Sequence, residues 1–151
     1  MDLPIYYFDV DTAIQEHNLI IDRSGGLDGL REIGLLESVL EHIQNDFYYP
    51  EFEDKLTHLV FAVNKFHAFN DGNKRASLYL GAYFMELNGY DYCIERFWHE
   101  FENYAVSLAE GRLEKPVLQQ MIRAYIYEEE FSESLKLTLI ESLTPLTVGV
   151  S

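Results

Sequence analysis

Two stretches with helical periodicity, joined by a short glycine-containing segment, constrain the fold more than any other feature of this sequence. The first, Asp54 to Phe66, places apolar residues at the spacing of an amphipathic helix, at Leu56, Leu59, Val60, Val63 and Phe66. The second, Lys74 to Leu87, contains no proline and one internal glycine, Gly81, and it stops at Asn88-Gly89, a common signal for a helix C-terminus. We therefore predict two helices, the second largely buried, with a loop between them.

The remainder of the chain also shows helical patterns, and together they predict an all-α fold. Gly34 to Gln44 carries five apolar residues on one face, which we expect to face the core: Leu35, Leu36, Val39, Leu40 and Ile43. Further helices are predicted at Asp11–Leu19, Phe97–Ala109, Pro116 to about Glu128, and Ser134–Leu143. Residues 90–94 are predicted to form a short extended connector or a single strand.

Length and composition limit the class of protein. A chain of 151 residues suits one domain with one core, and a hydrophobic fraction of 48% argues against disorder. No segment approaches the length of a membrane span, and the N-terminus Met1–Pro4 lacks the basic start of a secretory signal. Because the single cysteine, Cys93, cannot form an intramolecular disulfide, we expect a cytoplasmic protein in which Cys93 is buried as a small apolar residue.

The charge balance is strongly acidic, with 11 Lys and Arg against 26 Asp and Glu and a formal net charge of −15. Such a charge repels nucleic acid and anionic membranes, so we expect neither as a partner. A protein partner with a basic surface would complement it. The scarcity of cations also makes the adjacent pair Lys74 and Arg75, at the predicted start of the second helix, more informative.

The loop between the two central helices combines a histidine, a carboxylate, a glycine and two cations between His67 and Arg75. Asn70, Asp71 and Asn73 are favourable N-cap types, and Gly72 permits a tight turn, so we expect free amide groups at the start of the second helix. The partial positive charge of that helix end and the two cations all favour an anion. Phosphate is the usual occupant of such a site.

Two further residues of the loop suit catalysis. His67, with an ordinary pKa of about 6.5, is the candidate general base that takes a proton from a hydroxyl. Asp71 is the candidate ligand of Mg²⁺, which prefers oxygen ligands and shares them with substrate phosphates. The alternative is structural: His67 as a helix C-cap, Asp71 as an N-cap and the two cations as a solvated first turn. That alternative does not explain Lys74 and Arg75, because cations oppose the dipole at a helix N-terminus.

The same segment resembles the signature of the Fic/Doc superfamily, His-Pro-Phe-x-(Asp/Glu)-Gly-Asn-(Gly/Lys)-Arg, with Ala68 in place of the usual proline. The lysine at position 74 resembles the motif of the death-on-curing (Doc) toxin branch. The upstream segment GLREIGLLES at residues 29–38 resembles a segment of the same branch. The resemblance implies a single-domain Fic/Doc-like helical bundle at residues 1–126, with the active-site loop between two central helices. Residues 127–151 would then be a C-terminal extension of one packed helix and a tail.

The resemblance also implies a role for each residue of the loop. His67 would be the general base, Asp71 would hold Mg²⁺, and Lys74 and Arg75 would serve both catalysis and phosphate binding. The nucleotide-binding set would be Phe69, Asn70, Gly72, Asn73, Lys74 and Arg75. The co-substrate would be ATP or another nucleoside triphosphate.

Lys74 favours one of two chemistries. In Fic-type AMP transferases a glycine at this position leaves room for a nucleotide β-phosphate, whereas the Doc branch has lysine and is associated with transfer of the terminal phosphate to a protein hydroxyl. The resemblance therefore implies a Doc-like toxin of a type II toxin–antitoxin system, a Mg-dependent protein phosphotransferase that acts on a protein such as a translation factor. A separate antitoxin would restrain it, since the chain lacks the Ser/Thr-x-x-x-Glu-(Gly/Asn) string of self-inhibited Fic enzymes. Adenylylation of a protein, and non-catalytic binding of a nucleotide or partner, are the alternatives.

Overall fold

The computed structural model describes residues 3–24, 33–66 and 72–143, and within these ranges it contains eight α-helices, one short 3-10 helix and no β-strand. In chain order they are α1 (Val10–Ser24), α2 (Ile33–His42), α3 (Phe52–Lys65), α4 (Asn73–Leu87), η1 (Asp91–Cys93), α5 (Ile94–Phe101), α6 (Ala105–Ala109), α7 (Lys115–Tyr127) and α8 (Glu133–Leu143). The predicted all-α fold is confirmed. None of the described helices is long and apolar enough to cross a membrane.

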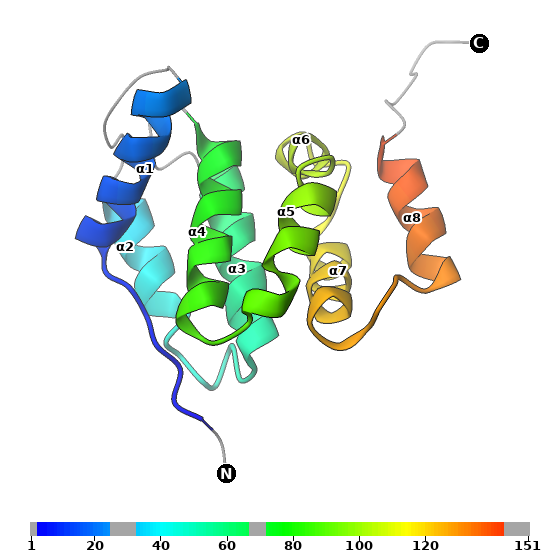
Figure 1. Cartoon of the computed structure of the whole chain (residues 1–151), viewed down its shortest axis with the longest axis horizontal. Coiled ribbons are helices and arrows are strands. Elements are labelled where there is room, and N and C mark those ends of the chain that lie inside the picture. The colour runs from blue at the N-terminus through cyan, green and yellow to red at the C-terminus, as the bar shows by residue number, and fades with distance from the viewer. Residues whose placement is uncertain (1–2, 25–32, 67–71, 144–151) are drawn as a thin grey trace.

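The helices α3 and α4 form the centre of the molecule. Figure 1 shows them side by side, with α1 and α2 on one side, α5 to α7 on the other, and α8 at the outer edge. The buried residues of the core come mainly from the two central helices, and Leu56, Leu59, Leu80 and Phe84 have no exposed surface. The loop that joins α3 to α4 carries the histidine motif, so the largest helix contact of the fold holds the two ends of that motif in place.

The first central helix begins at Phe52, two residues before the predicted start at Asp54. A capping box explains the earlier start, because the Asp54 carboxylate accepts a hydrogen bond from the Glu51 amide at 3.0 Å and the Glu51 side chain accepts one from the third helical residue. The apolar face is buried as predicted except for Phe66, which caps the C-terminus and is 43% exposed.

Gly81 in the middle of α4 has a packing role that the sequence did not indicate. A Cβ atom at this position would lie 2.9 Å from Val60 Cγ2 on α3 and 3.1 Å from Phe97 Cζ on α5. Only a hydrogen at Gly81 lets α4 lie so close to both neighbours. The glycine is therefore required by the close approach of three helices.

Two predictions for the N-terminal part were wrong in detail. α1 continues to Ser24, five residues beyond the predicted end at Leu19, and it stops directly before the Gly25-Gly26 pair. On α2 the predicted apolar face includes Leu35, but that side chain is 36% exposed, whereas Leu36, Val39, Leu40 and Ile43 are buried. The buried stripe of α2 is therefore narrower than predicted by one residue, Leu35.

The prediction for residues 90–109 was also wrong. Residues 91–93 form the 3-10 helix η1 and not a strand, and the predicted helix Phe97–Ala109 is two helices, α5 and α6, separated by a turn. Phe97 and Phe101 stack on each other inside the core with ring centroids 5.5 Å apart. A turn at residues 102–104 separates the two helices, and Ala105 and Leu108 of α6 are buried in the same core.

The C-terminal helices agree with the predictions. α7 has Glu114 as its N-cap and Pro116 in its first turn, and α8 packs on the bundle through Leu135 and Leu139. The carbonyl of Ser142, near the end of α8, accepts hydrogen bonds from Ser107 Oγ and the Arg112 guanidinium. Cys93 is buried as predicted, and burial raises the pKa of its thiol.

Candidate phosphate-binding site

The structure describes the helix ends on either side of the motif loop and residues 72–75 of the motif itself. His67, Ala68, Phe69, Asn70 and Asp71 lie outside the described residues. The predicted roles of His67 as general base and Asp71 as metal ligand therefore stay predictions. No group of three His, Cys, Asp or Glu residues that could hold a metal occurs in the described ranges.

Gly72 is the residue that turns the chain into α4. It has φ 72° and ψ 23°, in the left-handed region that glycine adopts at little cost, and it occupies the N-cap position. Its carbonyl accepts the first helical hydrogen bond, from the Ala76 amide at 2.8 Å. The prediction of a tight turn at Gly72 is confirmed.

The N-cap differs from the prediction. We expected Asn70, Asp71 or Asn73 to occupy the cap position of α4, but Gly72 occupies it, and Asn73 is instead the first helical residue and is buried. Glycine has no side chain that could cap the helix from this position. Because the first amide groups of a helix have no acceptor within the helix, they and the helix dipole present a positive end, which favours an anion.

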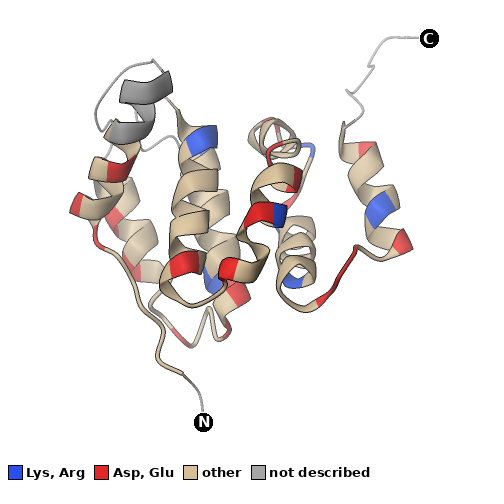
Figure 2. Ribbon diagram, viewed as in Figure 1, with Lys and Arg blue, Asp and Glu red and all other residues tan. Residues whose placement is uncertain are grey.

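Lys74 and Arg75 are both exposed on the first turn of α4. In the described part of the chain no carboxylate pairs with either of them, although five other cations do have carboxylate partners: Lys55, Arg96, Arg112, Arg123 and Lys136. Figure 2 shows their end of α4 in blue, while red segments occur at the other end of α4 and on α1, α2, α3, α5 and α8. In a chain with a net charge of −15, two adjacent cations at a helix N-terminus that no described carboxylate pairs with favour an added anion.

The last turn of α3 borders the same loop but points elsewhere. Lys65 Nζ lies 5.8 Å from the centroid of the Phe61 ring and beside the turn at Gly111, so its side chain is directed toward the connection between α6 and α7. Asn64 is fully buried and donates a hydrogen bond to the Ala105 carbonyl on α6 at 3.1 Å. These contacts anchor the C-terminal end of α3, from which the motif loop starts.

A comparison with family models places this geometry in a known family. The model of the Fic/DOC family matches residues 7–85, which include the segment at 29–38, the whole of α3, the motif loop and all but the last two residues of α4. The chain belongs to the Fic/Doc family. As a member of that family it is similar to the "Protein kinase doc" of Escherichia phage P1, with 38% identity over 83 residues, and the predicted likeness to the Doc branch is confirmed. That match covers 52% of this chain and 65% of the phage protein.

The predicted site residues that the structure describes lie together at the start of α4, whereas the groups that support this end of the helix pair were not predicted. Lys74, Arg75 and Gly72 were predicted, and the structure brings them together at one helix end. The tie between Asn64 and α6 was not predicted, because its partner lies 41 residues further along the chain. A polar residue among the apolar positions of a buried helix was the only signal that could have indicated it.

Proposed function

We propose that this protein is a Doc-like toxin of a type II toxin–antitoxin system that transfers the terminal phosphate of a nucleoside triphosphate to a hydroxyl of a protein. The observation that carries the proposal is the first turn of α4, where Lys74 and Arg75 follow Gly72 and have no carboxylate partner in the described ranges. Membership in the Fic/Doc family and the likeness to a phage protein named as a protein kinase support the same activity. ATP is the proposed co-substrate.

In the proposed reaction the phosphate chain binds at the start of α4, where Lys74 and Arg75 offset its charge. His67 accepts the proton of the protein hydroxyl as the hydroxyl oxygen attacks the terminal phosphorus, and the bond from that phosphorus to the bridging oxygen breaks to release the nucleoside diphosphate. Asp71 is the proposed ligand of Mg²⁺, which when bound would supply positive charge beside the phosphates. Phe69, Asn70, Gly72 and Asn73 complete the proposed nucleotide-binding loop.

The proposed protein substrate is a translation factor, and a separate antitoxin is the proposed regulator. Both functions place the protein in the cytoplasm. Adenylylation is the competing reaction, and in that case the nucleotide itself would remain on the acceptor. The two reactions differ in which phosphorus of ATP is attacked, so isotopic labelling distinguishes them.

The test compares ATP labelled at the γ-phosphate with ATP labelled at the α-phosphate, each incubated with the protein and a cell extract. We expect a labelled acceptor protein with γ-label only, and no labelling by His67→Ala. Lys74→Gly should reduce γ-transfer by roughly a hundredfold, as expected for loss of a charge-stabilising group. Lys136→Gly is the matched control. Lys136 lies on α8 and pairs with Glu130, which precedes α8, and with Glu133, so its substitution should not affect transfer.

Two outcomes would contradict the proposal. Label retained from the α-position would show nucleotide transfer, and the kinase assignment would be wrong. No transfer with either label, together with unchanged nucleotide affinity in His67→Ala, would indicate a non-catalytic binding protein.

A further inference from the structure

A cavity of about 870 Å³ lies at the end of α3 and α4 that is opposite to the motif loop. Its wall includes Glu51 and Glu53 at the start of α3, Asn88 at the end of α4, and Tyr127 at the end of α7. Its volume is within the range of protein sites that bind small molecules or side chains. The cavity is separate from the proposed active site, and nothing in the proposed reaction uses it.

The polar groups of the cavity are mainly hydrogen-bond acceptors, and each of them is either negatively charged or neutral. Three carboxylates line it, those of Asp46, Glu51 and Glu53, and no Lys, Arg or His of the described chain is among its lining residues. Two phenols, those of Tyr90 and Tyr127, line the same cavity. Burial first, and then the negative charges of Glu53 and Glu51, raise the pKa of Tyr90 and raise that of Tyr127 to about 12. Both phenols are therefore neutral at physiological pH and the cavity has a negative potential.

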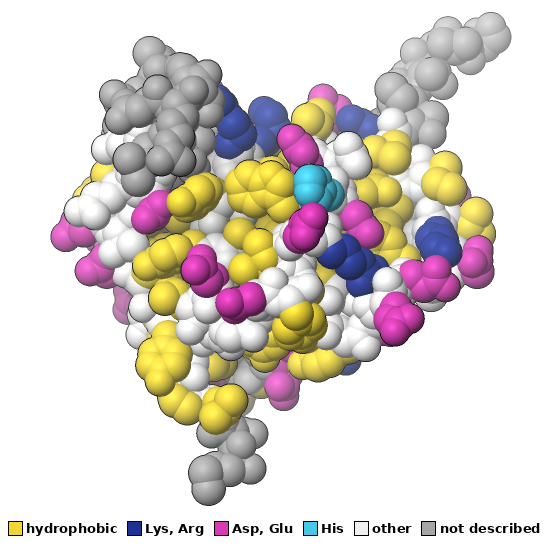
Figure 3. All heavy atoms as spheres, in the orientation of Figure 1, with side chains coloured by type: hydrophobic (Ala, Val, Ile, Leu, Met, Phe, Trp, Pro, Cys, Tyr) yellow, Lys and Arg dark blue, Asp and Glu magenta, His cyan; other side chains and the backbone are white. Residues whose placement is uncertain are grey.

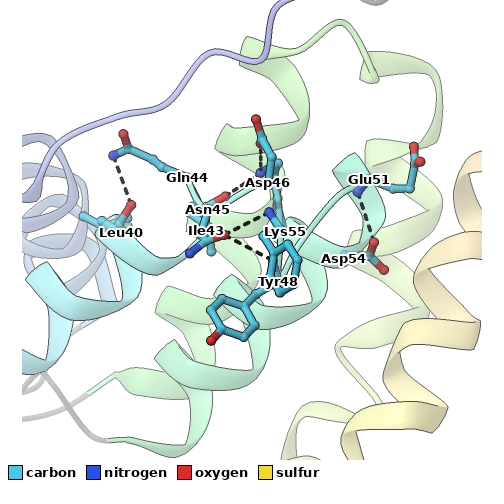
Figure 4. A network of polar contacts seen from close by, with 10 residues as sticks. Leu40, Ile43, Gln44, Asn45, Asp46, Tyr48, Glu51, Asp54 and Lys55 are labelled. Carbon is cyan, nitrogen blue, oxygen red and sulfur yellow. Dashed lines mark hydrogen bonds and ion pairs between the residues drawn. The ribbon is translucent and has the colours of Figure 1, made fainter.

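Two of the three carboxylates already have a cation partner outside the cavity. Lys55 is fully buried and donates hydrogen bonds of 2.8 Å to the Ile43 carbonyl and to Asp46, as Figure 4 shows. Arg123 pairs with Glu53 at 3.0 Å. Glu51 has no cation partner in the described part of the chain, so the cavity carries one negative charge in excess. Asp46 is 81% exposed and can accept further hydrogen bonds.

The cavity also offers aromatic surface. Tyr7 and Tyr90 line the cavity and are half-buried, and the buried ring of Phe52 supports Tyr90 from behind, with ring centroids 4.4 Å apart. Aromatic faces next to carboxylates suit a guanidinium group, which can stack on the rings while its N–H groups bind the acids. A simple metal ion would not use the aromatic faces.

Apolar side chains extend this surface beyond the cavity. Leu3 lines it and is 86% exposed, and Phe47, which follows Asp46 in the chain, is 88% exposed. Figure 3 shows hydrophobic side chains gathered beside the N-terminal segment. A small cation that fills the cavity would not reach Phe47. An extended chain with an apolar residue near its cation would bury these side chains as well.

We propose that this cavity binds an arginine side chain of an extended, basic segment of a partner protein. The guanidinium donates hydrogen bonds to Glu51 and Asp46 and lies against the aromatic wall. The neighbouring apolar residue of the segment covers Leu3 and Phe47. The excess negative charge of the cavity and of the whole chain attracts such a segment and disfavours an acidic one.

The test uses the full chain and two labelled pentapeptides, Gly-Leu-Arg-Leu-Gly and the same peptide with citrulline in place of arginine. Citrulline has nearly the same shape as arginine but no charge. We expect the arginine peptide to bind about tenfold more tightly in fluorescence anisotropy, as for loss of a hydrogen-bonded charge. In ¹H–¹⁵N spectra it should shift the amides of Tyr7, Glu51, Asn88 and Tyr127.

Glu51→Gln should weaken binding of the arginine peptide to about the level of the citrulline peptide. Glutamine keeps an oxygen that can accept the capping hydrogen bond of α3, so the fold should be retained. Glu141→Gln is the matched control, because Glu141 is exposed on α8 and is not part of the cavity wall. Phe47→Ser should also weaken binding of the arginine peptide, although it leaves the charge of the cavity unchanged.

Three outcomes would overturn the proposal. Equal affinity for the two peptides would exclude recognition of the guanidinium. Amide shifts spread over the acidic surface, with equal losses in Glu51→Gln and Glu141→Gln, would indicate non-specific attraction. Spermidine or arginine amide binding as tightly as the peptide would make this a small-molecule site.

Discussion

At the scale of single residues, two glycines of the central helix pair illustrate different constraints. Gly72 has a positive φ, so its backbone conformation is the reason for the glycine. Gly81 lies inside α4, where a side chain would collide with Val60 and Phe97, so its missing Cβ is the reason. The sequence does not distinguish these two roles of glycine, and only the backbone conformation and the neighbouring helices reveal them.

Gly81→Ala should lower the free energy of unfolding by about 1 to 3 kcal/mol, because overpacking outweighs the better helix propensity of alanine. Urea denaturation measures it. Gly34→Ala is the control: Gly34 is also helical, but no atom lies within 4 Å of the position that a methyl group would take there, so that variant should be slightly more stable than the parent. Equal effects of the two substitutions would show that helix propensity, and not packing, decides.

At the scale of elements, the α2–α3 loop, α3 and α7 meet at His58. Its Nδ1 lies 2.9 Å from Lys115 Nζ, and its ring stacks on Tyr49 with centroids 4.8 Å apart. Burial, then the charges of Lys115 and His42, lower the pKa of His58 to about 4. The neutral imidazole accepts a hydrogen bond from the Lys115 ammonium, and this contact joins the helices α3 and α7.

This contact predicts a loss of stability in acid. Between the pKa of His58 in the folded protein, about 4, and its ordinary value of 6.5, the unfolded chain binds more protons than the folded one. The free energy of unfolding should therefore fall as the pH decreases from about 6.5 to 4, by at most about 3 kcal/mol from this residue. His58→Gln should flatten the dependence, measured by urea denaturation at several pH values. His99→Gln, on the exposed face of α5, should leave it unchanged.

At the scale of the whole molecule, the chain has a net charge of −15, and its acidic residues lie on α1 to α5, on α8 and in the connecting loops, as the red segments in Figure 2 show. Only the start of α4 has adjacent exposed cations without a carboxylate partner in the described ranges. Repulsion between the many carboxylates opposes the compact state, and the same field disfavours anionic partners everywhere except at that helix end.

Raising the ionic strength should therefore stabilise the fold, because salt screens repulsion between exposed charges. We expect Tm in calorimetry to rise by a few degrees between about 20 and 200 mM sodium chloride. Sodium sulfate at equal ionic strength should raise Tm further if the start of α4 binds an anion, and Arg75→Ala should reduce that additional rise. A Tm that falls with salt would show that attractive ion pairs dominate.

The central features of the molecule could be predicted from local patterns. The periodicity of residues 54–66 and 74–87 identified both central helices, and Pro116 indicated the start of α7. The tight turn at Gly72 was also predicted from residue chemistry alone, and the anion site at Lys74 and Arg75 stays a prediction. The errors occurred where distant parts of the chain decide, as in the division of residues 97–109 into α5 and α6.

The sequence by itself determined the all-α class, the family and the cations at the start of α4, because each depends on residues that are close in the chain. The tertiary structure alone decided that Leu35 of α2 is exposed, why Gly81 must lack a side chain, and where His58 meets Lys115. It also created the cavity at the end of α3 and α4 from four stretches of the chain, residues 3–7, 44–53, 88–90 and 127. Packing between residues that are distant in the chain leaves no local sequence pattern. This is the physical reason why these features could be seen only in the tertiary structure.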